Sequence, residues 1–553
     1  MCALPSCGYL FRCLPPAVTA AAAAAVDGAV REFVAAIGDL PPIPSSSIAA
    51  DILQLPIGEG WGGCGLYSAS VVAPLAHAAS FLQNAPAILE RLQPSAPSAT
   101  AIARELQSIF TAIYAVSAPP PAAAAVATTL PVAAATASSS GAVPPPPVPS
   151  TNLERTYASL STTISQLNIA REHPFAQALE DGPQPGLQRV FTQASHARLR
   201  ADLDRKLTSA APEVRRRIDS SRGYAAGAWQ RQLPRRWPTN FQSRGKRYTF
   251  NENLNGVHFC NTLRLHLHLP FPQLLGGRIR CCVPLSRDPG SALCGALLDE
   301  FGYHSERCPG LVGSLTIPHN LVRNATFVTA SEAGLRPVLE PPQRLADPRG
   351  AGPDTWQRPA DVLLPASAPH GLQRDGSIPR DMCIDATCRY VLRAGCLHQP
   401  VDATLRAAHA RKQQRLVAPN QAVFPLAFAS AGGAFHPEGL RVMLTAWASR
   451  MDAPADDGDG NGAAEERRTA LDHRLHLSWL PRFSAVAHLG LSMLLMKVLD
   501  ALDASAAGWD GDDDGAGCGD DALRPRQPQY SDYVCSRAHF TTALGTSSSS
   551  GAG

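Results

Sequence analysis

The chain has 553 residues and a formal net charge of +3, so its length suits roughly two to four domains and its overall charge does not argue for nucleic acid binding. Its 14 cysteines do not form a disulfide framework, which excludes a small stapled secreted domain and favours a reducing compartment, nuclear or cytoplasmic. Arg12 interrupts the apolar N-terminus, so no signal peptide is expected. The best apolar run, Leu489 to Leu502, is short and carries two charges, so no membrane span or membrane partner is expected.

The N-terminal region, residues 1–117, has the apolar spacing of helices. Helices are predicted over residues 20–37, where Phe33 and Ile37 lie four apart, and over residues 82–92 and 101–116. Between them, residues 55–66 are rich in glycine. A phosphate-binding loop would need a following Lys-Ser or Lys-Thr pair and a preceding strand, so a tight structural turn is the favoured interpretation. Residues 118–150 are rich in proline and alanine, carry no charge, and are predicted to be a disordered linker.

Residues 151–275 are predicted to be helical and are rich in arginine. Aromatic residues are interleaved with this charge, and such a mixture can follow a phosphate backbone and stack on bases. A solvated helix face with aromatic core anchors explains the pattern equally well. The candidate nucleic-acid contacts are Arg215, Arg216, Arg217, Arg235 and Arg236.

Residues 276–325 contain three possible zinc ligands at compact spacing, Cys294, His304 and Cys308. A closed structural zinc site takes four thiolate or imidazole ligands, so the fourth must come from Cys281 or Cys282, and Cys282 is taken as the candidate. Gly302, just before His304, would permit a sharp turn. The alternative is a set of buried cysteines near an unrelated histidine.

Residues 326–430 contain two acids beside short apolar runs, Asp361 and Asp385. Strands are predicted at residues 361–365 and 382–388, and two carboxylates on adjacent strands would make an oxygen site suited to Mg²⁺. Lys412, on a predicted helix over residues 405–412, would hold a water or stabilise developing negative charge, and Glu340 is a lesser candidate. Singly, each is more often a surface acid or a strand-end cap, so the prediction depends on their order.

Residues 431–545 are predicted to be mostly helical, with two acidic, glycine-rich loops at residues 452–462 and 510–521 that lack the ligand spacing of a calcium loop. The tail, residues 546–553, is rich in serine and glycine and is predicted to be disordered.

Taken in order, several segments resemble the C-terminal half of non-LTR retrotransposon polyproteins of the restriction-like-endonuclease class. The similar segments are residues 9–16, 55–66, 227–234, 263–270, 294–308, His319 with Asn320 and Arg323, residues 358–361, 385–387 and 409–412. The resemblance implies a helical thumb and linker region, a Cys-Cys-His-Cys knuckle and a restriction-type endonuclease. Pro318 stands where the family has an arginine. The polymerase palm is absent, so copying of RNA is not expected of this chain.

The resulting expectation is an α/β protein with a restriction-endonuclease-like mixed sheet flanked by helices, preceded by mostly helical regions and a small zinc knuckle. The resemblance implies a Mg²⁺-dependent endonuclease that nicks target DNA to prime reverse transcription, with structural Zn²⁺. His319, Asn320 and Arg323 would contact nucleic acid. The expected partners are DNA and the element RNA, with a reverse transcriptase acting in trans. The alternatives are a non-catalytic nucleic-acid-binding zinc-knuckle protein and an inactive, truncated retroelement relic.

Overall fold

The computed structural model describes residues 10–91, 186–232, 239–243, 246–250, 253–254, 256–275, 278–288, 290–341, 360–366, 380–414, 421–451 and 475–507. The chain divides into two compact units, Met1–Phe33 with Leu66–Asp204, and Val34–Gly65 with Arg205–Gly553. The predicted linker and tail, the helix expected over residues 101–116, both acidic loops, Arg235, Arg236 and residues 358–359 lie outside the described residues.

In the first unit, helices α2 (Pro16–Ile37), α4 (Ala69–Arg91) and α8 (Leu187–Thr208) are present, although α2 and α8 continue into the second unit. Small side chains on α2 and α4 form an apolar cluster with Phe11. Asp27 of α2 accepts hydrogen bonds from the backbone N–H groups of Ala69 and Ser70, so it satisfies donors at the start of α4. The predicted helix over residues 20–37 forms as part of α2. Phe33 and Ile37 do not form its buried face, however, because they are 58% and 38% exposed.

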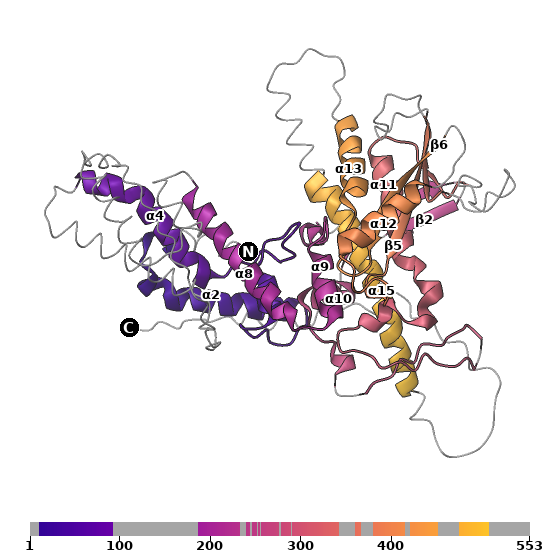
Figure 1. Cartoon of the computed structure of the whole chain (residues 1–553), viewed down its shortest axis with the longest axis horizontal. Helices are drawn as coiled ribbons and strands as arrows, with labels where there is room; N and C mark the ends of the chain where they lie inside the picture. The colour runs from indigo at the N-terminus through magenta and orange to yellow at the C-terminus, as the bar shows by residue number, and fades with distance from the viewer. Residues whose placement is uncertain are drawn as a thin grey trace, which may run out of the picture. The chain divides into compact units, whose positions relative to one another are not determined.

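The second unit contains helices and strands that gather around one long helix, α15 (Figure 1). The helices are α3 (Ile48–Gln54), α9 (Pro212–Ser221), α10 (Gly256–Leu267), α11 (Thr316–Glu332), α12 (Val401–Gln413), α13 (Pro437–Met451) and α15 (Leu480–Ala507). Short 3₁₀ turns are η1 (Ala228–Arg231), η2 (Pro272–Leu274), η3 (Tyr303–Glu306) and η4 (Pro309–Ser314), and a π-helical turn, η6 (Leu475–Trp479), leads into α15. The strands are β1 (Thr239–Ser243), β2 (Lys246–Phe250), β3 (Val338–Leu339), β4 (Val362–Leu364), β5 (Asp381–Arg389) and β6 (Gln421–Ala429).

Four strands form a mixed sheet in the order β3-β4-β5-β6. The pairs β3–β4 and β4–β5 are antiparallel, whereas β5 and β6 are parallel and α12 makes the crossover between them. Pro425 lies within β6 and has no backbone N–H to donate to a neighbouring strand. An edge strand tolerates this loss, and β6 lies at the edge of this sheet. The fold is therefore a mixed helix-and-sheet arrangement, in agreement with the coarse α/β prediction.

The two faces of the sheet carry different side chains, as the period of two along a strand requires. One face contributes Val362, Ile384 and Phe428, among others, to the main core, which also takes in side chains of α11, α13 and α15. Leu363 and Cys383 belong to a separate apolar cluster. Asp361 and Asp385 have the same parity as these two residues, so they are placed on the second face.

Helix α15 is apolar and mostly buried, and it contacts α10, α11, η1 and η3. The helical stretch Leu475–Ala506 is long and apolar enough to cross a membrane, contrary to the sequence expectation, but 67% of its apolar window is buried inside the protein, as in a core helix. Arg482 on α15 is 1% exposed and donates to both carboxylate oxygens of Glu332 at 2.8 Å and to Thr329, which joins α15 to α11.

Local predictions were most accurate around the sheet. Strands β4 and β5 and helix α12 form where the apolar patterns predicted them. The glycine-rich segment is a tight turn, since Gly62 and Gly65 have positive φ and a Cβ on Gly63 would lie 2.0 Å from the Leu55 carbonyl oxygen. The prediction that residues 151–275 are helical was wrong at residues 239–250, where β1 and β2 form an antiparallel hairpin, although α8, α9 and α10 lie within the range.

Because Arg482 is buried and charged, we expect the loss of its partner Glu332 to lower the free energy of unfolding substantially. Glu332→Ala should lower the free energy of unfolding by about 3 kcal/mol, since it leaves a buried guanidinium without its carboxylate. Urea unfolding would measure the change. Glu213→Ala is the matched control, because its pair with Arg307 is partly exposed and should cost about 1 kcal/mol or less. Equal losses in the two variants would contradict this role of Arg482.

Candidate functional site

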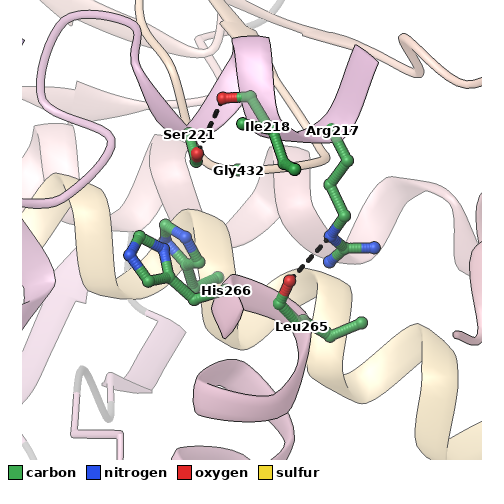
Figure 2. A pocket seen from close by; sticks show the side chains of 7 residues that line it. Arg217, Ile218, Ser221, Leu265, His266 and Gly432 are labelled. Atoms are coloured by element: carbon green, nitrogen blue, oxygen red, sulfur yellow. Dashed lines mark hydrogen bonds between the residues drawn. The ribbon is translucent and has the colours of Figure 1, made fainter. Parts of the chain in front are cut away.

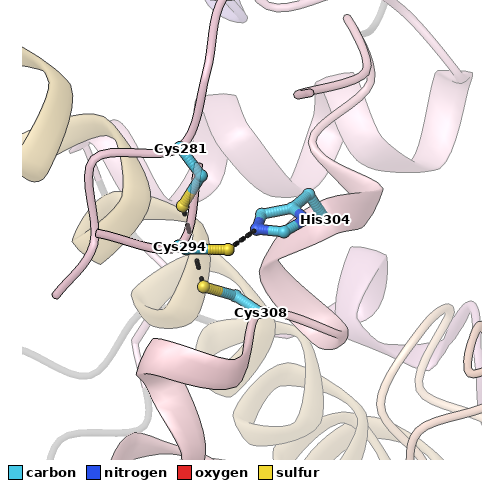
Figure 3. Close-up of side chains that lie close together, drawn as sticks. All are labelled: Cys281, Cys294, His304 and Cys308. Carbon is cyan, nitrogen blue, oxygen red and sulfur yellow. Dashed lines mark hydrogen bonds between the residues drawn. The ribbon is translucent and has the colours of Figure 1, made fainter. Parts of the chain in front are cut away.

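Four side chains converge on one point in the residues 278–308: Cys281, Cys294, His304 and Cys308 (Figure 3). The sulfur atoms of Cys281 and Cys308 are 3.7 Å apart, and Cys294 Sγ lies 3.4 Å from His304 Nε2. Tetrahedral zinc with Zn–S of about 2.3 Å and Zn–N of about 2.0–2.1 Å separates two sulfurs by about 3.8 Å and sulfur from nitrogen by about 3.6 Å. The cluster could therefore hold a zinc ion with little movement of its ligands.

Cys281 completes this cluster, whereas the prediction placed Cys282 there. Residues 279–298 form an irregular antiparallel pair, in which Cys281 exchanges backbone hydrogen bonds with Gly295 and Ala296. Successive side chains on an extended strand point to opposite sides, so only one of the two neighbouring cysteines can face the cluster. Cys281 is buried, while the Cys282 thiol is partly exposed and lies 3.5 Å from the Arg280 carbonyl oxygen.

The turn that carries His304 is held by the carboxylate of Asp299. This side chain accepts hydrogen bonds from the backbone N–H groups of Phe301, Tyr303 and His304. Gly302 has a φ of 71°, as the predicted sharp turn requires, and a Cβ there would lie 2.7 Å from Leu495 of α15. These contacts hold the backbone of the turn that carries the imidazole.

The cluster is packed against apolar side chains that include Val283, Leu311 and Val498. The hydrogen bond with Cys281 lowers the pKa of the Cys308 thiol, and the same bond raises the pKa of Cys281, because the pair shares a proton. Thiolates are the ligands of zinc, so binding the ion would release the remaining protons.

Replacement of a cluster cysteine should remove zinc, and replacement of its neighbour should not. We expect Cys281→Ser to lose the bound zinc and to unfold at a lower temperature, because zinc sites of this kind contribute directly to folding. Cys282→Ser should keep about one zinc in the cluster and the wild-type melting temperature. Elemental analysis and thermal unfolding of both variants would measure this, and loss of zinc in Cys282→Ser alone would contradict the assignment.

A second group of polar side chains lies at one end of the sheet. Val362 of β4 pairs with Ile384 of β5, so Asp361 and Asp385 occupy the next position of the two antiparallel strands. Lys412, in the last turn of α12, donates to Asp385 Oδ2 at 2.6 Å. Asp361 accepts from the Ala386 backbone N–H at 2.6 Å and lies 3.1 Å from His319 Nε2 of α11. The structure thus brings together Asp361, Asp385, Lys412 and His319.

A cavity of about 710 Å³ opens beside this group. Its charged lining residues are Arg389, Arg411 and Lys412, and His319 and Thr387 add polar groups. Among the residues that the structure describes, no carboxylate belongs to the lining of this cavity. An anionic ligand would therefore find complementary charge there, next to the two aspartates. Arg389 and Arg411 were not among the predicted site residues, although Arg411 directly precedes Lys412 in the sequence.

No known protein family, curated protein or solved structure matches the chain in comparisons of its sequence and fold.

The remaining predicted site residues lie near the acid–lysine group but differ in their contacts. Glu340 is exposed, has a φ of 46°, and forms an ion pair with Arg323. Its backbone N–H donates to the Asp361 carbonyl oxygen at 3.0 Å. Asn320 lies in the first turns of α11 and is partly buried. Among the described residues, Asp361, Asp385 and Glu340 do not belong to a group of three ligands within 4.8 Å of one another.

Two of the arginines predicted to contact nucleic acid are internal. Arg216 donates to Thr404 Oγ1 of α12 at 3.0 Å, and Arg217 donates to the Leu265 carbonyl oxygen at 3.1 Å. Both side chains are buried, and Arg217 also lies over the Tyr303 ring. They connect α9 to neighbouring elements and cannot reach a phosphate backbone in this fold. Arg215 is exposed and keeps its predicted role as a proposal.

Arg217 also lines a small cavity with His266 of α10 and His488 of α15 (Figure 2). Its volume of about 10 Å³ has room for about one water molecule, so it cannot be a substrate site. Burial lowers the pKa of His266 to about 3, helped by the positive charge of Arg217, and burial lowers the pKa of His488 to about 4. The two rings are therefore neutral in the folded protein at neutral pH.

These neutral histidines predict acid sensitivity. The unfolded chain binds a proton at His488 below pH about 6.5, whereas the folded chain does so only near pH 4. The free energy of unfolding therefore has its full value above pH 6.5 and decreases as the pH falls toward 4. His488→Gln should remove about 1.4 kcal/mol of this loss per pH unit. Urea unfolding at pH 7, 6 and 5 would show it. The exposed His398→Gln should keep the wild-type slope, and an unchanged slope in His488→Gln would contradict the assignment.

Proposed function

We propose that this chain is a Mg²⁺-dependent DNA endonuclease that nicks target DNA during integration of a non-LTR retrotransposon. The observation that carries the proposal is the meeting of Asp361, Asp385 and Lys412, from three separate segments, beside a cavity lined by positive charge. The mixed sheet flanked by helices supports the restriction-endonuclease-like core that the resemblance implies.

The two aspartates have roles that follow from their positions. Antiparallel pairing places them side by side on one sheet face, where two carboxylates repel each other unless positive charge lies between them. Lys412 supplies such a charge to Asp385, and the backbone N–H of Ala386 supplies a hydrogen bond to Asp361. Each carboxylate therefore has a partner that offsets this repulsion.

The donor set fits Mg²⁺ by its chemistry. This ion prefers carboxylate oxygens, is commonly held by one or two carboxylates, and fills its other positions with water and phosphate oxygens. Asp361 and Asp385 would hold it, and Glu340 would reach it only after release from Arg323. When bound, the ion would polarise the scissile phosphate and lower the pKa of a coordinated water.

The other residues act on the substrate directly. Arg389 and Arg411 would contact phosphate groups of the strand, since both line the cavity. The Lys412 ammonium lies next to the aspartates and would stabilise negative charge that develops at the attacked phosphate. His319 orients the Asp361 carboxylate through their 3.1 Å contact. Zinc bound by Cys281, Cys294, His304 and Cys308 would stabilise the knuckle segment that precedes α11.

Nicking of supercoiled plasmid in the presence of Mg²⁺ would test the proposal. Asp361→Asn, Asp385→Asn and Lys412→Ala should each lower the rate by roughly 100-fold or more, because each removes a group at the proposed reaction centre. Asp381→Asn is the matched control. It is the first residue of the same strand, four residues before Asp385, where its carboxylate accepts from the Ala366 N–H, and should keep wild-type nicking.

The alternative is a protein that binds nucleic acid without cleaving it, which the cationic cavity also favours. Wild-type protein that binds DNA in a salt-dependent manner but does not nick it would support this alternative and refute the nuclease. Nicking that persists in both aspartate variants would also refute the proposed reaction centre.

A further inference from the structure

A second group of metal-binding side chains lies apart from the cysteine cluster. It consists of His409 on α12, His436 just before α13, and Glu438 in the first turn of α13, and one potential ligand atom of each lies within 4.8 Å of the others. The histidines lie 27 positions apart in the sequence, with strand β6 between them along the chain, so only the tertiary structure brings them together.

The two imidazoles are buried, and the His436 ring has a nitrogen without a hydrogen-bond partner. Each residue is 5% exposed, and the Nδ1 atom of His436 makes no hydrogen bond in the structure. The rings stack with centroids 4.4 Å apart and planes inclined by 27°. A buried polar atom without a partner costs free energy, and in native proteins it commonly indicates a ligand or a functional role.

The backbone around the group is held independently of these side chains. The His436 N–H donates to the Ala427 carbonyl oxygen of β6 at 2.9 Å, and its own carbonyl accepts from Gly439 and Leu440. A Cβ on Gly439 would lie 2.9 Å from the Pro425 carbonyl oxygen and 3.7 Å from His409 Nδ1. Glycine at this position therefore lets the first turn of α13 approach the Pro425 carbonyl of β6, next to the His409 ring.

The two rings lie among groups of both charges. Burial and the neighbouring His436 lower the pKa of His409 to about 4, against a backbone hydrogen bond with Pro425 that raises it, and burial also lowers the pKa of His436. Glu438 and Asp402 contribute negative potential at His436, and Arg406 opposes it.

We propose that His409, His436 and Glu438 form a second metal site, which binds a divalent cation of the zinc class and leaves at least one coordination position open. Two imidazoles and a carboxylate are a ligand set that zinc uses where a water or substrate takes the fourth position. Zinc ligands of this kind lie about 3.3 Å apart, so ligand atoms now within 4.8 Å of one another would move together by up to about 1.5 Å. Glu438 is exposed, so the group can be reached from solvent on the side of this carboxylate.

An ion at this site would link α12 to the first turn of α13. His409 lies three residues before Lys412, so the same helix would carry a metal ligand and, about one turn further along, the lysine of the acid–lysine group. Ion binding by His409, His436 and Glu438 does not require nuclease activity.

Zinc content of the full-length protein after dialysis against zinc would test the proposal. We expect two ions per chain in the wild type and one in His409→Ala and in His436→Ala, with the cysteine centre still loaded. Glu438→Gln should weaken the second ion by more than about tenfold, and because this side chain is exposed the variant should fold normally. His398→Ala, an exposed histidine outside the group, should keep two ions.

Cobalt substitution would distinguish the two centres, because only the cysteine centre has thiolate ligands. Wild-type protein should show a thiolate charge-transfer band together with a second set of ligand-field bands that disappears in Glu438→Gln and His436→Ala. One ion per chain in the wild type would overturn the proposal. Two ions that survive in His436→Ala and bind Glu438→Gln with wild-type affinity would overturn it as well.

Discussion

The packing of one buried apolar helix, α15, organises the second unit. Near its start, Phe483 belongs to the main core beside the sheet. Further along, Leu495 packs with Phe271, and Val498 closes the pocket around the Cys281–Cys308 pair. Hydrophobic burial along this single element therefore holds both the sheet that carries the aspartates and the turn that carries the zinc ligands. Loss of its packing would disturb both centres together.

Buried arginines make specific contacts between the packed helices. Arg482 ties α15 to α11, and Arg216 and Arg217 tie α9 to α12 and α10. A buried guanidinium is costly unless its donors are paired, so each of these contacts specifies which segments meet. The arginine-rich stretch thus serves partly as internal scaffold. Its neutral histidine neighbours, His266 and His488, make the same region sensitive to acid.

Much of the acid–lysine group could be predicted from local sequence. Apolar runs beside Asp361 and Asp385 predicted two strands, and the helical spacing before Lys412 predicted α12, because these patterns depend on near neighbours in the chain. The register that sets Val362 opposite Ile384 was not predictable in this way, and neither were the contacts of His319 and Glu340. These depend on how α11 packs against the sheet.

The sequence by itself determined which residues can bind metal and where strands and helices form, since side-chain chemistry and short-range periodicity are properties of the local chain. Tertiary structure decided which of them meet. It turned Cys281 inward and Cys282 outward, because alternate residues of an extended strand face opposite sides. It buried Arg216 and Arg217 rather than presenting them to a ligand. It also brought together His409 and His436, which precede and follow β6 in the sequence, and no local pattern encodes this pairing.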